Sequence, residues 1–286
     1  MNSLRVVLVC AALTICGCAK QDSPAPAGRY ATPEAGVEAF VNALRQHDRA
    51  ALRDILGPEA DALLRSGDEV QSARERETFL DAFDQHQELV STRPDVLTLE
   101  VGAERWPLPI PLVKRDGSWQ FDAAGGADEL VLRRIGRNEL AAIDVCHGVV
   151  AAQLEYAAKN GAYASKVLSD PGKRNGLYWE TRPGEAQSPA GPLLALAAAE
   201  GYELGKNPTP YHGYYYRSLP ASPTDSTGKG FAFVAYPAEY GASGVMTFFV
   251  NHDGVVYQAD LGEDTEAHAR ALTGYSIDEA WSPAET

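Results

Sequence analysis

The residues whose types and spacing could do chemistry lie in the last third of this 286-residue chain. His212 and Glu239 offer a possible acid/base pair, and Arg217 adds a cation to the same region. A histidine and a carboxylate of this kind could transfer protons, and aromatic rings nearby could stack on the flat faces of sugars. The rings in this candidate site are those of Tyr214, Tyr216 and Tyr240.

These residues also have a structural interpretation. Tyrosine is common in β-strands, where one face of the ring packs and the hydroxyl reaches the rim. Glu239 could simply pair with Arg217 or cap a turn. The pattern therefore leaves open three roles for this region: structure, ligand binding and catalysis.

Two charged clusters are weaker candidates. The acids at 260, 263, 264 and 266 lack the spacing of a calcium loop and are typical of a helix start. The group Arg133, Arg134, Arg137, Asn138 and Glu139 is predicted to form interdomain ion pairs rather than a phosphate site. The chain has no Walker A loop, zinc-spaced Cys/His set or GxSxG elbow, so we predict no metal site and no cofactor.

The N-terminal residues indicate where in the cell the protein is located. Arg5 precedes an apolar run over 6–15 that is shorter than the roughly 20 residues of a membrane span. The following Ile15-Cys16-Gly17-Cys18 resembles a bacterial lipobox, with Cys18 as the lipidated first residue of the mature protein. Residues 1–17 are then the signal peptide and 18–31 a Pro/Ala-rich tether. The alternative is an ordinary cysteine after a secretory signal.

The expected location is the bacterial cell envelope, with the membrane as a partner through the N-terminal lipid. Ala19, rather than an aspartate, follows Cys18, which resembles the pattern sorted to the outer membrane facing the periplasm. Without Arg5 the mature chain keeps 24 of its 25 Lys+Arg against 39 Asp+Glu, a formal charge of −15. Such a charge argues against a nucleic-acid partner. Cys146 would be the one cysteine left unmodified, which excludes an internal disulfide.

Residues 32–124 are predicted to form a first α+β domain. Thr32 and Asp48 are typical N-caps of helices, and shorter and longer helices follow over 59–64 and 72–89. Alternating residues then predict strands over 96–101, 106–114 and 119–121, the last two joined by a turn at 115–118. Because the prolines at 107, 109 and 111 share one parity, we expect 106–114 to be an edge strand with one edge closed to pairing. A proline-rich ligand for another protein is the alternative.

Residues 125–274 are predicted to form a long helix over 128–160 and an antiparallel sheet, with 275–286 as a tail. Gly161 is the expected C-cap, and Ile143, Cys146, Val150, Leu154 and Ala157 are the expected apolar face, which would bury Cys146. A short helix at 193–200 precedes strands at about 212–219, 231–236, 245–251 and 254–260. The last two strands should form a hairpin through the turn 251–254. The fold class is therefore α+β.

Three resemblances follow from these patterns. Helices that could curl over a sheet in 32–124 resemble the cystatin-like nuclear-transport-factor-2 superfamily, and the long helix with its sheet resembles type IV pilins and pseudopilins. End to end, the chain is similar to a bacterial family known as domain of unknown function 2950. That similarity is carried by WPLPIPLVKRDGSWQFD (106–122), RRIGRNEL (133–140), PYHGYYYRSL (210–219) and FVAYPAEYGASGVMTFFVNHDGVVYQADLG (233–262). It implies an exported or lipidated envelope protein and no established activity.

Two functional hypotheses remain, with a third behind them. The first is a non-enzymatic binding or scaffolding module that engages an envelope protein or a glycan. The second is an envelope hydrolase acting on a cell-wall or glycan component, with His212 and Glu239 as acid and base. The third is a carrier of a small hydrophobic ligand.

Overall fold

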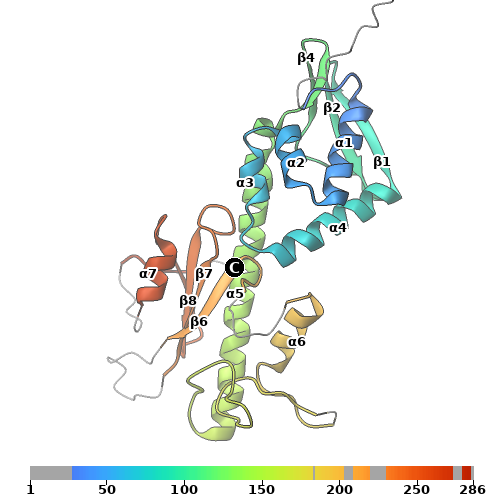
Figure 1. Cartoon of the computed structure of the whole chain (residues 1–286). Helices are drawn as coiled ribbons and strands as arrows, with labels where there is room; N and C mark the ends of the chain where they lie inside the picture. The colour runs from blue at the N-terminus through green and yellow to red at the C-terminus, as the bar shows by residue number, and fades with distance from the viewer. Residues whose placement is uncertain (1–27, 183, 203–208, 220–229, 273–278, 285–286) are drawn as a thin grey trace, which may run out of the picture.

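A computed structural model describes residues 28–182, 184–202, 209–219, 230–272 and 279–284. Antiparallel sheets and helices make up the described part, so the predicted α+β class is confirmed. A single long helix, α5 (Ala127–Asn160), runs through the molecule, with the N-terminal helices and sheet at one end and a second sheet along the other (Figure 1). In the described residues no helix is both long and apolar enough to cross a membrane.

The first two helices begin where the sequence predicts caps, whereas the predicted helix over 72–89 begins three residues early, at Glu69. Thr32 accepts a hydrogen bond from the N–H of Ala35, and Asp48 accepts one from the N–H of Ala51. These bonds satisfy N–H groups of the first helical turn, which have no partner within the helix. The helices are α1 (Pro33–Gln46), α2 (Arg49–Leu56), α3 (Ala60–Leu64) and α4 (Glu69–Gln85).

The predicted helix over 72–89 is wrong at its C-terminal end. Helix α4 ends at Gln85, and the chain becomes extended at His86. The next residues form a strand because they pair along the whole neighbouring strand, with Leu89 opposite Leu99. The first sheet has the order β1-β2-β4-β5, with β3 also paired to β2. Its strands are β1 (Gln87–Arg93), β2 (Val96–Val101), β3 (Trp106–Pro107), β4 (Leu112–Arg115) and β5 (Ser118–Phe121).

The predicted edge strand over 106–114 is also wrong. The segment splits into β3 and β4, and β4 lies inside the sheet between β2 and β5. This is possible because the paired residues of β4 begin after Pro111, so each of them has an N–H to donate. Between the two strands Leu108 and Ile110 are buried, and the N–H of Leu108 donates to the carbonyl of Leu99.

Aromatic side chains fill the space between these helices and the first sheet. The ring of Phe40 in α1 lies 5.2 Å from that of Phe121 in β5 and 5.9 Å from that of Phe79 in α4. Leu99 and Leu112 are fully buried in the same core. The helix–sheet interface is therefore a packed core, held by apolar burial.

Helix α5 confirms the predicted spine but corrects its face. Gly161 takes the left-handed conformation and its N–H donates to Ala157, as a C-cap does. Cys146 is fully buried, whereas Leu154, predicted to pack, is 52% exposed. At 100° per residue, position 154 lies about 80° around the helix from 146. The buried face is instead formed by Ala142, Ile143, Cys146, Val149, Ala152, Gln153 and Tyr156.

The second sheet packs one face on α5 and the other on α7 (Figure 1). Its order is β10-β9-β8-β7-β6, and the hairpin predicted at 251–254 joins β8 to β9. Gly254 takes a positive φ in that turn. The elements are α6 (Gly191–Ala199), β6 (Tyr214–Leu219), β7 (Ala232–Pro237), β8 (Met246–Asn251), β9 (Val256–Asp260), α7 (Thr265–Ala271) and β10 (Ser282–Pro283).

Candidate functional site

Strand β6 separates the predicted site residues onto two faces of the sheet. Tyr214 and Tyr216 belong to the core beneath α5, where the hydroxyl of Tyr214 donates to the carbonyl of Met246. Arg217 points to the other face, where its guanidinium donates to the carbonyls of Ala269 and Leu272 around the end of α7. Alternate residues of a strand face opposite sides, so these three groups cannot meet in one site.

Glu239 and Tyr240 are also held in local contacts. The backbone N–H of Glu239 donates to the hydroxyl oxygen of Ser243, and the negative charge of the Glu239 carboxylate acts to raise the pKa of Arg134. The hydroxyl of Tyr240 lies 3.2 Å from Asp260 at the surface. His212 has a different acidic neighbour from the one the sequence suggested.

That neighbour is Glu200, which directly follows α6. Oε2 of Glu200 lies 3.0 Å from Nε2 of His212 and 3.3 Å from the guanidinium of Arg74 in α4. The ring of Tyr211 packs edge-on against that of His212, with 4.3 Å between centroids. Burial, followed by the charge of Glu200, raises the pKa of Tyr211 to about 12. We call Arg74, Glu200, Tyr211 and His212 the Glu200 cluster.

Beneath the Glu200 cluster lies Asp68, which is 2% exposed and caps α4. Its Oδ1 accepts from the N–H of Gln71, and its Oδ2 accepts from the hydroxyl of Tyr202 at 2.7 Å and the N–H of Gly213 at 3.0 Å. Burial and the bond to Asp68 raise the pKa of Tyr202. With three donors, the Asp68 carboxylate joins α4 to β6 and the end of α6 and has a structural role.

Gly213 allows the close approach of β6 to α5 at this point. Its φ is +73°, and a Cβ there would lie 2.4 Å from Nδ2 of Asn138. Asn138 is 1% exposed, donates to the carbonyl of Ser243 and accepts from the side chain of Gln71. A residue with a side chain at 213 would push these two elements apart.

Polar side chains of α5 complete this junction between the two ends of the molecule. Arg134, 8% exposed, donates at 2.7 Å to the carbonyls of both Leu63 and Arg65. Burial lowers the pKa of its guanidinium. Arg137 pairs with Glu75 in α4 at 2.6 Å, which is an ion pair of the kind that the sequence predicted for the charged group at 133–139.

Arg133 and Glu139, the other two charged residues of the group at 133–139, make different contacts. Arg133 pairs with Glu129 within α5 itself rather than across the junction. Glu139 accepts from the N–H groups of Val245 and Met246, both at 3.0 Å. Four of the five residues thus tie α5 to other elements, whereas Arg133 pairs only within α5.

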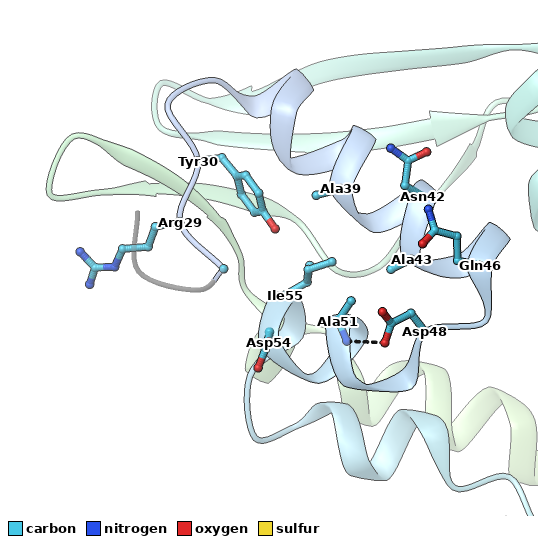
Figure 2. A pocket seen from close by; sticks show the side chains of 11 residues that line it. Arg29, Tyr30, Ala39, Asn42, Ala43, Gln46, Asp48, Ala51, Asp54 and Ile55 are labelled. Carbon is cyan, nitrogen blue, oxygen red and sulfur yellow. Dashed lines mark hydrogen bonds between the residues drawn. The ribbon is translucent and has the colours of Figure 1, made fainter. Parts of the chain in front are cut away.

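A hollow of about 500 Å³ opens beside the point where the described chain begins (Figure 2). It lies between the entry segment at Gly28 and Tyr30, helix α1 and helix α2. Asn42 and Gln46 stand at its rim, and Tyr30 points across it toward Ile55. Burial, followed by the charge of Asp54, raises the pKa of Tyr30. The hollow is wide and mostly exposed, without a buried unpartnered polar group among its described lining residues.

The chemistry that these sites can support is limited. Burial raises the pKa of the Cys146 thiol to about 12, so the thiolate that a nucleophile needs is not formed near neutral pH. Within the described part of the chain no three His, Cys, Asp or Glu residues group as metal ligands. Asp260 accepts from Gly262 and Tyr240, and Glu266 pairs with Arg270. Among the described residues, the shortest contact between a histidine and a carboxylate is that of His212 and Glu200, which is the acid/base arrangement that this geometry best supports.

The fold and its junction define a class: an α+β protein in which one long helix ties an N-terminal helix–sheet unit to a second antiparallel sheet. The family model described as "Protein of unknown function (DUF2950)" matches residues 28–284, so the chain belongs to this family. No curated protein and no solved structure matches the chain. The likenesses to pilins and to the nuclear-transport-factor-2 superfamily therefore stay predictions.

Sequence reasoning missed Asp68, Glu200 and Tyr202. Asp68 followed by Glu69 is a helix-start signal that could have been read from the sequence. Glu200 and Tyr202 carry no comparable signal, because Tyr202 reaches Asp68 across 134 positions of the chain.

Proposed function

We propose that this protein is a lipid-anchored component of the bacterial envelope that acts by binding, with an envelope protein or a glycan as its partner. One observation carries the binding role: three polar side chains near the predicted site, those of Asp68, Glu139 and Arg217, are engaged in structural hydrogen bonds. Asp68 has three donors, Glu139 has two, and Arg217 spans two carbonyls. A side chain engaged in this way is not free to activate a substrate.

The anchor is supported by the sequence. The charged start, the short apolar run and Cys18 before a Pro/Ala-rich tether together fit a lipoprotein signal. The family match begins at residue 28, beyond this segment, which fits a folded body that follows a leader and a tether.

Labelling of growing cells with a palmitate analogue tests the anchor. Wild-type protein should carry the label, and Cys18→Ala should lose it. Cys146→Ala is the matched control, because Cys146 is fully buried and should leave labelling unchanged. Unlabelled wild-type protein, or label that persists in Cys18→Ala, would contradict the lipid anchor.

The binding role is tested by incubating purified protein with isolated cell wall and with the native envelope. We expect retention on one of them, or a crosslinked partner in constant ratio to the protein, without release of soluble fragments. His212→Ala should bind as the wild type does. Fragments released by the wild type and absent with a folded His212→Ala variant would replace the binding role with the hydrolase.

The hydrolase remains the second candidate because of one contact. Nε2 of His212 lies 3.0 Å from Oε2 of Glu200, and both side chains keep some exposure, 24% and 17%. Such a pair could act as acid and base on a cell-wall or glycan component, with Glu200 in the place that the sequence gave to Glu239. Glu200→Gln and Glu239→Gln distinguish these two assignments, because the first alone should abolish any turnover.

A further inference from the structure

A second hollow, of about 300 Å³, lies along one side of α6, from Gly191 to Ala198, and shares no lining residue with the hollow of Figure 2. Its lower part is formed by Tyr178, Ser188 and Leu194, and its rim includes Glu180, Gln187 and Ala195. Its volume is at the lower end of the range for small-molecule sites, about 300–1,000 Å³. We call it the α6 hollow.

The chain around the α6 hollow is fixed in position before any ligand arrives. The N–H of Tyr178 donates to Val167 at 2.8 Å, and its carbonyl accepts from Ser169 at 2.8 Å. The N–H of Ala190 donates to Leu177, which is 1% exposed. Backbone held on both sides in this way gives a preformed site, and a preformed site loses less conformational entropy on binding.

Ser188 supplies the observation that points to a ligand. It lines the α6 hollow and is 2% exposed, yet its hydroxyl has no hydrogen-bond partner among the described residues. A buried hydroxyl without a partner destabilises a protein, so such groups are rare and need an explanation. The first two residues of helix α6 add no donor to the hollow, because the N–H of Gly191 donates to the carbonyl of Ser188 and Pro192 has no N–H.

The groups around the α6 hollow indicate the class of ligand. Hydroxyl, amide and carboxylate groups alternate with the ring of Tyr178 and the aliphatic side chains of Leu194 and Ala195. None of the described residues that line it is basic, so a phosphate or another strong anion would have no counter-charge. A sugar ring matches both kinds of surface, because its hydroxyls need donors and acceptors and its C–H face packs on an aromatic ring.

We propose that the α6 hollow binds a neutral sugar ring, with Ser188 hydrogen-bonded to a ring hydroxyl and Glu180 accepting from another at the rim. This inference rests on the proposed binding role and identifies its ligand class. It is independent of the lipid anchor and of the Glu200 cluster.

The test is a titration of the purified full chain with N-acetylglucosamine, glucose and galactose, followed by saturation-transfer NMR and calorimetry. Glycerol, which has hydroxyls but no ring face, is the negative probe. We expect at least one sugar to bind with a dissociation constant in about the millimolar range, as is typical of a small site with few polar contacts. Absence of binding by all three sugars overturns the proposal.

Two variants on adjacent residues of α6 locate the binding. Ala195→Trp places a large ring in the rim and should abolish the sugar signal, whereas Leu196→Trp, at a side chain that is 54% exposed and outside the lining, should keep it. Circular dichroism checks that both variants fold. Binding retained by Ala195→Trp, or lost equally in Leu196→Trp, overturns the assignment to the α6 hollow.

Ser188→Ala isolates the hydroxyl. It should weaken sugar binding about five- to tenfold, the effect of one lost hydrogen bond, without loss of the fold. Unchanged affinity in this variant overturns the role of Ser188. A negative titration leaves the labelling of Cys18 and the retention by cell wall or envelope untouched, so the failure of this inference can be told from the failure of the proposed function.

Discussion

Polar side chains are buried both at the junction beneath the Glu200 cluster and at the α6 hollow. The two regions differ in whether these side chains have hydrogen-bond partners. At the junction, Asp68 and Asn138 have hydrogen-bond partners on several elements. At the α6 hollow, the buried hydroxyl of Ser188 has none among the described residues. The difference teaches that partnered groups hold the junction together, whereas Ser188 combines a missing partner with a place in the lining of a hollow, and this combination marks a place for a ligand.

Arg134→Met should have the largest effect on the junction. It removes the donors to two carbonyls at the C-terminal end of α3, so we expect a loss of about 4 kcal/mol in the free energy of unfolding, measured by urea denaturation. Arg133→Met is the matched control on the next residue, since its exposed pair with Glu129 contributes about 0.5 kcal/mol or less. Equal losses in the two variants would show that the junction does not depend on Arg134.

Gly213→Ala should follow, with a loss of about 3 kcal/mol from steric overlap with Asn138 and from the positive φ. Gly241→Ala separates the two causes, because Gly241 has a φ of +71° but nothing within 4 Å of its added Cβ. The control should lose only about 1 kcal/mol. If both variants unfold at the same urea concentration, β6 and α5 do not need their close approach.

Tyr202→Phe tests one hydrogen bond of Asp68. Because the hydroxyl that it removes is buried and donates at 2.7 Å, we expect a loss of about 1–2 kcal/mol, by the same urea method. Tyr240→Phe removes a surface hydroxyl bonded to Asp260 and should change stability by less than about 0.5 kcal/mol. A Tyr202→Phe variant as stable as Tyr240→Phe would contradict the structural role of Asp68.

The smallest effect should be a dependence on alkaline pH. The pKa of Tyr211 is raised from 10.0 to about 12 in the folded protein, so the folded state binds the hydroxyl proton more tightly than the unfolded state. The resulting stability is present below pH 10 and is lost as the pH rises from 10 through 12. The urea midpoint should therefore fall between pH 10 and 12, and Tyr211→Phe should make this fall shallower. If the urea midpoint of Tyr211→Phe falls with pH as steeply as that of the wild type, Tyr211 does not contribute to the pH dependence.

Local signals predicted the parts of the fold that depend on neighbouring residues. The caps at Thr32 and Asp48, the end of α5 at Gly161 and the turn at 251–254 were predicted because each is set by a few adjacent side chains. Strand β1 was missed because its conformation comes from pairing with β2.

Contacts between distant segments explain what the sequence could not predict of the candidate site. Strand alternation shows that Tyr216 and Arg217 face opposite sides, but no pattern in the sequence places Glu200 against His212 or Tyr202 against Asp68. Ser188 likewise looks ordinary in the sequence, because a missing hydrogen bond is visible only when the surrounding backbone is in place.

The most direct test of the comparison is the urea denaturation of Ser188→Ala beside Tyr202→Phe. If the Ser188 hydroxyl is held for a ligand, its removal from the free protein relieves an unpartnered group, and the free energy of unfolding should stay the same or rise by up to about 1 kcal/mol. Tyr202→Phe should lower it. A fall in Ser188→Ala as large as that in Tyr202→Phe would show that the Ser188 hydroxyl stabilises the fold like the groups at the junction, and would contradict the account.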